Sequence, residues 1–555
     1  MSSFRHLAFA LAVPLAIHGA AATPAAAQAD AAASSVARAV DTNVIRAHTE
    51  FLSDDALEGR GPGTRGGLVA ARYIAAQFER LGLVPAGDSN SYYHRVPVIS
   101  LTPTAQARLE GGSGASELKF KDDYVMWSMR NDASVSASAD LVFVGYGIVA
   151  PEYGWDDYKG ADVKGKIVVT LVNTPGLVDT TLFKGKVMTY YGRWTYKIEE
   201  AARQGAAGIM IVHTPESATY GWPTVVGSWT GPQTRVERDP TSLLIAGWFS
   251  QAESDRVLQP VGGLEQAIAK ASKKGFTAVP LNQKLSATVQ STIRRSETYN
   301  ILGRRPGKGA KADEVVLIGG HYDHLGISQP VDGDSIYNGA VDNASGTAAM
   351  LAAAEAFARS GVTTPRSIVF MAFAAEESGL LGSTAFAERP SIPLKQIAAV
   401  LNMDVMNLYG KTRDISALGL DQSSLGQTFT AAAKAEGLRV IVNRDALIKG
   451  SFFRSDHFPL ARNGVPSLSL ESGLDFVGRP EGWGKQQQDE YNEKRYHQPS
   501  DELLPWYTFA GAAQQVRVIV RAAVAAAQAA NQPTWAAGSE FKAAGERRLN
   551  TGAGR

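Results

Sequence analysis

The 555-residue sequence contains no cysteine. This absence excludes disulfide bonds, zinc sites with thiolate ligands and a cysteine nucleophile. An excess of charge is also missing, because 55 Lys and Arg side chains nearly balance 54 Asp and Glu side chains. We therefore expect neither nucleic acid nor an anionic membrane surface among the partners. The one basic cluster, GRRPGKGAK at 303–311, is interrupted by glycine and proline and is interpreted as a solvated loop.

Residues 1–29 have the pattern of a signal peptide. Arg5 and His6 precede an apolar run at 7–17 that is too short to span a bilayer, and small residues follow. The tripeptide Ala-Gln-Ala at 27–29 fits a cleavage site before Asp30. We expect an exported protein, periplasmic or secreted, without membrane attachment after cleavage. An uncleaved membrane anchor is the alternative, and Pro14 and the short run disfavour it. No other segment reaches membrane-spanning length.

The remaining sequence divides into four segments: 30–134, 135–280, 281–530 and 531–555. The first contains two stretches with helical spacing, 42–55 and 66–83. The second has short β-branched runs and few helical ones, which predicts a β-rich insert, and it contains no cluster of metal-binding residues. The fourth is expected to be a C-terminal tail that is loosely ordered over its last 20 residues.

Segment 281–530 alternates apolar strands with helices. Four nearly continuous apolar runs, typical of parallel strands covered on both faces, lie at 314–320, 367–375, 397–403 and 465–470. Helical stretches at 346–360, 425–437 and 508–530 separate or follow them. This alternation predicts an α/β fold with a doubly wound, mostly parallel sheet and helices on both faces.

Side chains that can bind metal follow four strand or loop ends in succession, namely His321 with Asp323, Asp342, Glu376 with Glu377, and Asp404. Ligands of open α/β sheets bind beyond the carboxyl ends of the strands. Five carboxylates and a histidine on one rim would repel each other without cations. Imidazole mixed with carboxylate suits Zn²⁺, and more than four ligands suggests two ions that share a carboxylate.

The adjacent pair Glu376 and Glu377 allows a division of labour. Successive side chains at a strand end point in different directions, so one glutamate can bind metal while its neighbour accepts a proton from water. A second histidine ligand is still needed. Both His457, in FFRSDHFPLARNG, and His497, in EKRYHQPSDE, are candidates, and spacing alone does not choose between them.

Five motifs occur in order: GGHYDHLG, NGAVDNASG, FAAEESGLLGS, NMD and RYHQPSDE. In this arrangement the chain resembles the secreted di-zinc aminopeptidases of the co-catalytic zinc exopeptidase group, which also includes glutamate carboxypeptidase and glutaminyl cyclase. The resemblance covers about 30–135 and 281–530, which would form the catalytic zinc peptidase domain. The insert, with DYKGADVKGKIVV and AARQGAAGIMIV, is similar to a protease-associated domain.

The resemblance implies two Zn²⁺ ions per chain, bridged by Asp342. It assigns His321 and Asp404 to one zinc, and Glu377 and His497 to the other. Val341 stands before the bridging residue where relatives often have Asn or Asp, but this position is not a ligand.

The same resemblance implies roles around the ligands. Glu376 would be the general base, Asp323 would orient His321, and Tyr496 would stabilise the tetrahedral intermediate. Asp501 would steady His497. His457 would line the substrate side.

The sequence therefore predicts an exported zinc aminopeptidase that removes N-terminal residues from peptides. Three alternatives remain at this stage. A carboxypeptidase of the same group would need a cationic pocket, to which Arg454 and Arg462 could contribute. A glutaminyl cyclase would bind one zinc, and a peptide-binding protein without activity would have no use for Glu376. The oligomeric state is not predicted.

Overall fold

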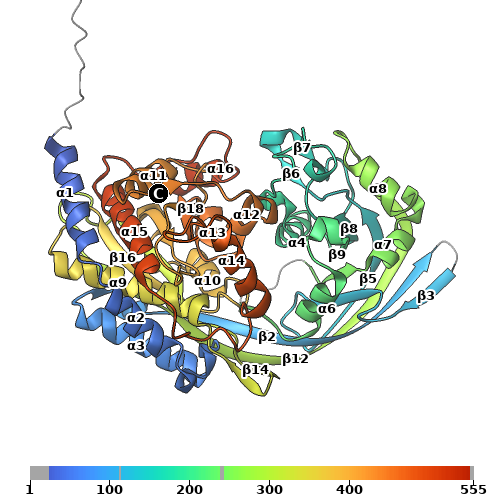
Figure 1. Cartoon of the computed structure of the whole chain (residues 1–555). Coiled ribbons are helices and arrows are strands. Elements are labelled where there is room, and N and C mark those ends of the chain that lie inside the picture. The colour runs from blue at the N-terminus through green and yellow to red at the C-terminus, as the bar shows by residue number, and fades with distance from the viewer. Residues whose placement is uncertain (1–23, 112–113, 238–242, 551–555) are drawn as a thin grey trace, which may run out of the picture.

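The computed structural model describes residues 24–111, 114–237 and 243–550. Figure 1 shows a larger unit built mostly from the N- and C-terminal parts of the chain and, beside it, the insert. Within the described residues, no helix is long and apolar enough to cross a membrane. Residues 1–23 of the predicted signal peptide lie outside the described residues. Helix α1 (Pro24–Arg38) runs through the predicted cleavage site and packs on α15 (Ala510–Gln528).

One sheet runs through both units. In the larger unit, four parallel strands form its centre in the order β20-β17-β13-β16. Antiparallel neighbours flank them, β18 on one side and β12 on the other. Their bounds are β13 Val315–His321, β16 Ser367–Phe373, β17 Ile397–Asn402, β18 Asp414–Leu418 and β20 Ser467–Glu471. All four predicted apolar runs are thus strands of a largely parallel α/β sheet, as expected.

Both faces of these strands are buried because successive side chains point to opposite faces. In β13, Val316 and Ile318 belong to one apolar cluster, and Val315 and Leu317 belong to another on the opposite face. The first face is covered by α9 and α15, and α1, α2, α3 and α11 lie further out on the same side. The second face is covered by α10 and α13. The bounds are α2 Thr42–Leu52, α3 Arg65–Arg80, α9 Ser345–Ser360, α10 Leu381–Glu388, α11 Leu425–Ala435 and α13 His457–Arg462. This layering leaves the carboxyl ends of the strands as the open edge.

The insert repeats this plan on a smaller scale. Its parallel strands follow the order β5-β8-β9-β11, with β4 antiparallel to β11. The strand bounds are β4 Tyr124–Ser128, β5 Ser134–Phe143, β8 Ile167–Leu171, β9 Gly208–Val212 and β11 Ile245–Phe249. Five helices accompany them: α4 Trp194–Arg203, α5 Pro215–Ala218, α6 Trp222–Thr230, α7 Gln251–Val257 and α8 Gly263–Ala271. The insert is therefore richer in helix than expected, and its sheet includes β4, which precedes residue 135.

A long two-stranded ribbon joins the two units (Figure 1). Strand β2 (Tyr93–Gly111) pairs antiparallel with β12 (Val279–Arg305), from Tyr93 opposite Ile301 to Gly111 opposite Gln283. At one end β12 pairs with β16 of the larger unit, and at the other with β5 of the insert. The ribbon fixes the insert relative to the larger unit through continuous backbone hydrogen bonds.

The expectation of a loosely ordered C-terminal tail is wrong for the described residues after 531. Helix α16 (Lys542–Asn550) follows two buried aromatic side chains, Trp535 and Phe541, and Phe541 stacks on Phe452. Arg548 donates to the carbonyl oxygens of Leu394 and Ile397 at 2.9 and 2.7 Å. Burial of the two aromatic side chains and the hydrogen bonds of Arg548 fix this segment on the larger unit, although its composition is mostly polar.

Candidate metal centre

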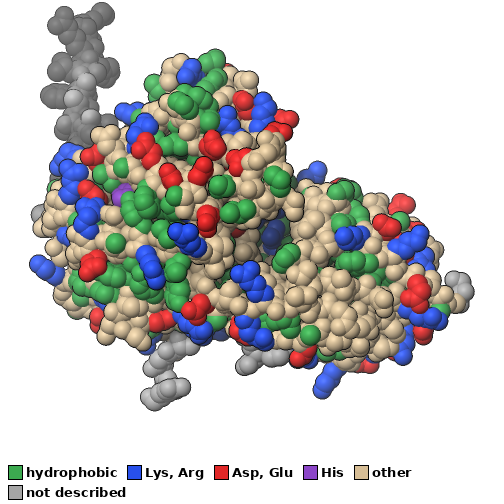
Figure 2. Space-filling model, turned by 90° about the horizontal axis from the view of Figure 1, so that it is seen from below, with side chains coloured by type: hydrophobic (Ala, Val, Ile, Leu, Met, Phe, Trp, Pro, Cys, Tyr) green, Lys and Arg blue, Asp and Glu red, His purple; other side chains and the backbone are tan. Residues whose placement is uncertain are grey.

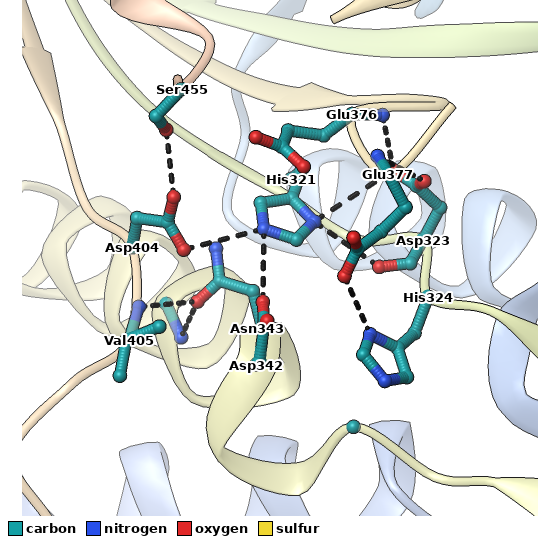
Figure 3. A network of polar contacts seen from close by, with 12 residues as sticks. His321, Asp323, His324, Asp342, Asn343, Glu376, Glu377, Asp404, Val405 and Ser455 are labelled. Atoms are coloured by element: carbon teal, nitrogen blue, oxygen red, sulfur yellow. Dashed lines mark hydrogen bonds and ion pairs between the residues drawn. The ribbon is translucent and has the colours of Figure 1, made fainter. Parts of the chain in front are cut away.

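The strands of the larger unit deliver a cluster of acidic and imidazole side chains to one edge of the sheet (Figure 3). His321 is the last residue of β13, and Glu376 and Glu377 follow β16 within a few residues. Asp404 follows β17, and Asp342 lies in the turn before α9. The side chain of Asn343 accepts a hydrogen bond from the Gly346 amide at 2.9 Å and so orders the start of that helix.

His321 faces two of the carboxylates. Its Nε2 atom lies 3.3 Å from Asp342 Oδ1 and 3.3 Å from Asp404 Oδ1. Its Nδ1 atom lies 3.2 Å from the backbone carbonyl oxygen of Asp323. With Nδ1–H donating to that carbonyl, the lone pair of Nε2 points at the two carboxylates, as a metal ligand requires.

His497 completes a second group on the other side of Asp342. Its Nε2 atom lies 3.0 Å from Glu377 Oε2 and 3.4 Å from Asp342 Oδ2. This nitrogen is buried and has no hydrogen-bond partner. The two oxygens of Asp342 therefore face different histidines. An orphaned ring nitrogen aimed between two carboxylates fits a metal ligand.

The structure separates the two histidines that the sequence left open. His457 is fully buried at the start of α13, packs edge-on against Phe452 at 4.6 Å between ring centres, and neither ring nitrogen has a hydrogen-bond partner. No contact joins it to the acidic cluster in the described parts of the chain. Burial lowers the pKa of His457 to about 3. The second histidine of the cluster is thus His497.

Without cations this cluster is electrostatically unbalanced. Burial tends to lower the pKa of His321, but the charges of Glu376 and Asp404 outweigh it and hold the pKa well above the usual value. Burial likewise opposes protonation of His497, yet its contacts with Asp342 and Glu377 raise its pKa to about 10. For Glu376, burial raises the pKa well above its usual value, and Glu377 and Asp404 add to the effect. Divalent cations would relieve this repulsion.

The geometry contains two sets of donors that can hold metal. The first set has ligand atoms of His321, Asp342 and Glu377 within 4.8 Å of one another, and the second has those of His321, Glu376 and Asp404. The contacts of His497 extend the first set. Oxygen and imidazole nitrogen without sulfur is a donor set that fits Zn²⁺.

Backbone strain is concentrated at the same edge. Ala375, directly before the glutamate pair, has φ of 54°, Val405 after Asp404 has φ of 55°, and His497 itself has φ of 59°. Left-handed conformations of residues other than glycine cost free energy and often accompany functional sites. Here they aim three of the cluster's side chains.

Known proteins resemble this chain in sequence and in structure. The model of "Peptidase family M28" matches residues 300–520. Aminopeptidase YwaD from Bacillus subtilis is 26% identical over 366 residues, which cover 64% of this chain and 62% of YwaD. A glutamate carboxypeptidase 2 homolog from Caenorhabditis elegans is 27% identical over 319 residues, or 48% of this chain and 37% of the homolog. The solved aminopeptidase from Aneurinibacillus sp. strain AM-1 aligns over 90% of this chain and 97% of its own, at 18% identity and a TM-score of 0.44.

Residues 300–520 are thus similar to peptidase family M28. The matched segment contains all eight residues predicted for the site, including the whole acidic and imidazole cluster. The chain spans less than two thirds of the length of the curated relatives named above.

Asp323 supports the acidic and imidazole cluster through contacts other than the expected one to His321. Its carboxylate lies 3.8 Å from His321 Nδ1, while its backbone oxygen makes the closer contact. The carboxylate oxygens instead accept hydrogen bonds from the backbone amides of Glu376 and Glu377 at 3.1 and 3.4 Å. Asp323 thus fixes the glutamate pair as well as the imidazole.

The expectation that Asp501 steadies His497 is wrong. Its carboxylate accepts hydrogen bonds from the amides of Val341 and Asp342 at 3.2 and 3.0 Å, and from the Tyr491 hydroxyl at 3.1 Å. It is fully buried and holds the turn that carries Asp342. Asp501 lies far from Asp342 in sequence, so no local pattern indicates this contact.

Two residues of the site were missed at the sequence level. His324, fully buried, has its Nδ1 atom 2.8 Å from Glu377 Oε1 and so orients that glutamate (Figure 3). Arg60, also fully buried, donates to the carbonyl oxygens of Tyr322 and Gly339 at 2.7 and 2.9 Å. The motif GGHYDHLG contains a signal for the first. The Gly-rich segment around Arg60 offers none, because three of the four carbonyl oxygens that accept from Arg60 lie more than 260 residues away, and only that of Leu52 is near in sequence.

Proposed function

We propose that the protein is a zinc-dependent aminopeptidase that removes residues from the free N-terminus of peptides, with two zinc ions per chain. The observation that supports two ions best is that the oxygens of Asp342 face His321 and His497 separately, at 3.3 and 3.4 Å. Family M28 and the aminopeptidase relatives support the reaction class.

In this proposal His321 and Asp404 would hold one zinc, Glu377 and His497 would hold the other, and the two would share the Asp342 carboxylate. When bound, the ions would act as Lewis acids on the scissile carbonyl and lower the pKa of a water toward neutrality. Ser455 donates to Asp404 Oδ2 at 2.7 Å, and His324 and Asp501 hold Glu377 and the Asp342 turn. These contacts pre-orient the ligands, which otherwise would lose freedom on binding.

Glu376 is the general base of the proposal. Its side chain adjoins Asp404 and His321 but makes no hydrogen bond with another described side chain. It would accept the proton of the attacking water and deliver it to the leaving amine. General acid–base catalysis of this kind contributes about 10²–10⁴-fold.

Tyr496 is placed to support the charge that develops on the substrate. Its ring stacks on the His497 ring with centres 3.9 Å apart, and the side chain is 44% exposed. In this proposal the hydroxyl of this half-exposed ring, which lies against a metal ligand, would donate to the oxygen of the tetrahedral intermediate.

We further propose that the protein is exported, periplasmic or secreted, and that the insert is a protease-associated domain. Peptides are the only partner that this site requires. The insert's own strand ends carry no metal-binding cluster among the described residues.

A panel of chromogenic aminoacyl substrates beside N-blocked peptides tests the proposed activity. We expect cleavage of free N-termini only, loss of activity with a chelator and recovery with Zn²⁺. Cleavage of blocked peptides would instead indicate a carboxypeptidase, and one zinc per chain with cyclisation of N-terminal glutamine would indicate a cyclase. Activity indifferent to the chelator would contradict the proposal.

A further inference from the structure

The insert meets the larger unit beside the metal cluster. Tyr190 packs against Phe458 at 5.0 Å between ring centres, and a side chain added at Gly450 would collide with Met188. Figure 1 shows α4 of the insert facing α12 (Arg444–Lys449) and α13 of the larger unit. The loop between these two helices contains Ser455, which hydrogen-bonds to Asp404. The insert thus forms one wall next to the proposed reaction centre.

Two arginines at this boundary are in opposite situations. Arg462 is neutralised, because it pairs with Glu199 of the insert and donates to the Tyr190 hydroxyl at 3.3 Å. Arg193, directly before α4, forms no ion pair with any described residue, and its buried Nε atom has no hydrogen-bond partner. Arg193 is half-buried, and a buried guanidinium N–H without an acceptor costs free energy, so this position favours an anion.

The surroundings of Arg193 strengthen this conclusion. Its electrostatic neighbours are Arg454 of the larger unit and the phenols of Tyr220 and Tyr190, and no carboxylate is among them. Burial, followed by the positive charge of Arg454, lowers the pKa of Arg193 to about 10. Tyr220 also interacts with both arginines, and burial raises its pKa, so its hydroxyl remains a donor. Two like charges held near each other without a counter-ion are destabilising unless a ligand supplies one.

Arg454 connects this pair to the reaction centre. It precedes Ser455, its side chain is exposed, and it donates to the Lys449 carbonyl oxygen at 3.1 Å. An extended peptide advances about 3.3–3.6 Å per residue. Because Ser455 contacts Asp404, the neighbouring Arg454 places this pair on the side of the cluster that the insert walls, where the residues after a cleaved bond can extend. The face drawn in Figure 2 is hollowed between the two units, and a basic side chain lies deep in the hollow.

We propose that Arg193 and Arg454, with the hydroxyl of Tyr220, form a subsite that binds a carboxylate of the substrate on the leaving-group side of the scissile bond. The inference rests on the proposed aminopeptidase function and extends it to a substrate class. The carboxylate is either the free C-terminus of a dipeptide or tripeptide, or an acidic side chain in the second position. Arginine suits this role because its planar fork binds carboxylate through two parallel hydrogen bonds.

The test compares four substrates with the same N-terminal leucine. Leu-Ala and its C-terminal amide differ in the terminal carboxylate, and Leu-Asp-amide and Leu-Asn-amide differ in the side-chain carboxylate. We expect the charged member of at least one pair to be cleaved with a kcat/KM about 10–100-fold higher, mainly through KM, since hydrogen bonds between charged groups contribute to this extent. The pair that shows the preference identifies the source of the carboxylate.

Variants then assign the preference to the two arginines. Arg454→Gln and Arg193→Gln should each bring the ratio of charged to uncharged substrate close to one, and Arg193→Lys should restore part of it. Lys159→Gln, which removes a positive charge from the exposed surface of the insert, is the matched control and should leave the ratio unchanged. Thermal unfolding of every variant shows whether Arg193 is needed for folding. Because Arg454 is exposed, its variant tests the subsite even if the Arg193 variants do not fold.

Equal cleavage of charged and uncharged substrates by the unmodified protein would overturn the subsite while leaving the aminopeptidase proposal intact. A ratio that survives both Gln substitutions would also overturn it. Failure to cleave all four substrates, with N-acetyl-Leu-Ala cleaved instead, would contradict the proposed function itself.

Discussion

Parallel strands of the larger unit end in acidic and imidazole side chains, whereas those of the insert end in neutral ones. After β8, Asn173 donates to the Ser217 carbonyl oxygen at 3.1 Å, and after β9, His213 contacts the Tyr220 carbonyl oxygen at 2.9 Å. After β11, Ser250 caps α7. These three side chains of the insert hydrogen-bond to nearby backbone groups, whereas the carboxylates and histidines at the strand ends of the larger unit face one another. The same strand–helix architecture thus serves packing in one unit and chemistry in the other.

The largest expected effect separates the two units directly. Asp342→Ala removes the carboxylate shared by both histidines, so we expect zinc content after dialysis to fall from two ions per chain toward zero and activity to become undetectable. His213→Gln, at a strand end of the insert, is the matched control and should keep both ions. Elemental analysis with activity assays measures both. Zinc loss in the His213 variant, or retention of two ions without Asp342, would contradict the comparison.

A second prediction divides the glutamate pair. Glu376→Gln should lower kcat by about 10²–10⁴-fold with zinc content unchanged, because this side chain is proposed to carry a proton and not a metal. Glu377→Gln, one residue further, should lose one zinc. These measurements distinguish a base from a ligand at neighbouring positions. If the Glu376 variant kept most of its turnover, its role as the base would be wrong.

These strand ends also show how far the sequence could predict the structure. The runs that became β13, β16, β17 and β20 are apolar along their whole length, and a motif at each end reveals the residues delivered there. Segments 93–111 and 279–305 pair across roughly 170 to 210 residues, so no local pattern in the sequence indicated that they form one ribbon.

Within the site, the sequence could predict those side chains that belong to motifs. The residue pattern alone could not decide between His457 and His497, because the choice depends on which loop returns to Asp342. Asp501 and Arg60 act through backbone groups distant in sequence, and such contacts leave no spacing that can be recognised. For the same reason the unpartnered Nε atom of Arg193 is visible only in three dimensions.

A third, smaller effect concerns the support of the metal ligands. Asp501→Asn replaces a carboxylate that accepts the amides of Val341 and Asp342, so the turn carrying Asp342 should become less well fixed. We expect zinc affinity to fall by about 10–100-fold, with activity recovered by added Zn²⁺. Tyr491→Phe removes only one donor to the same carboxylate and should have a weaker effect. Competition with a chromophoric chelator measures the affinity, and an unchanged value for the Asn variant would count against this role.

The smallest effect compares the acid sensitivity of the two units. Burial lowers the pKa of His48, in α2 of the larger unit, to about 4, so the folded protein binds fewer protons there than the unfolded chain between pH 6.5 and 4. Stability from this group is present above pH 6.5 and is lost as pH falls toward 4, by about 3 kcal/mol in total. His48→Gln, which keeps a partner for the Tyr73 hydroxyl, should flatten the decline. His213→Gln should flatten it less, because the contact of His213 with the Tyr220 carbonyl oxygen offsets part of the burial. Chemical unfolding of the metal-free protein at several pH values measures both slopes, and a steeper dependence on His213 than on His48 would reverse the expected order.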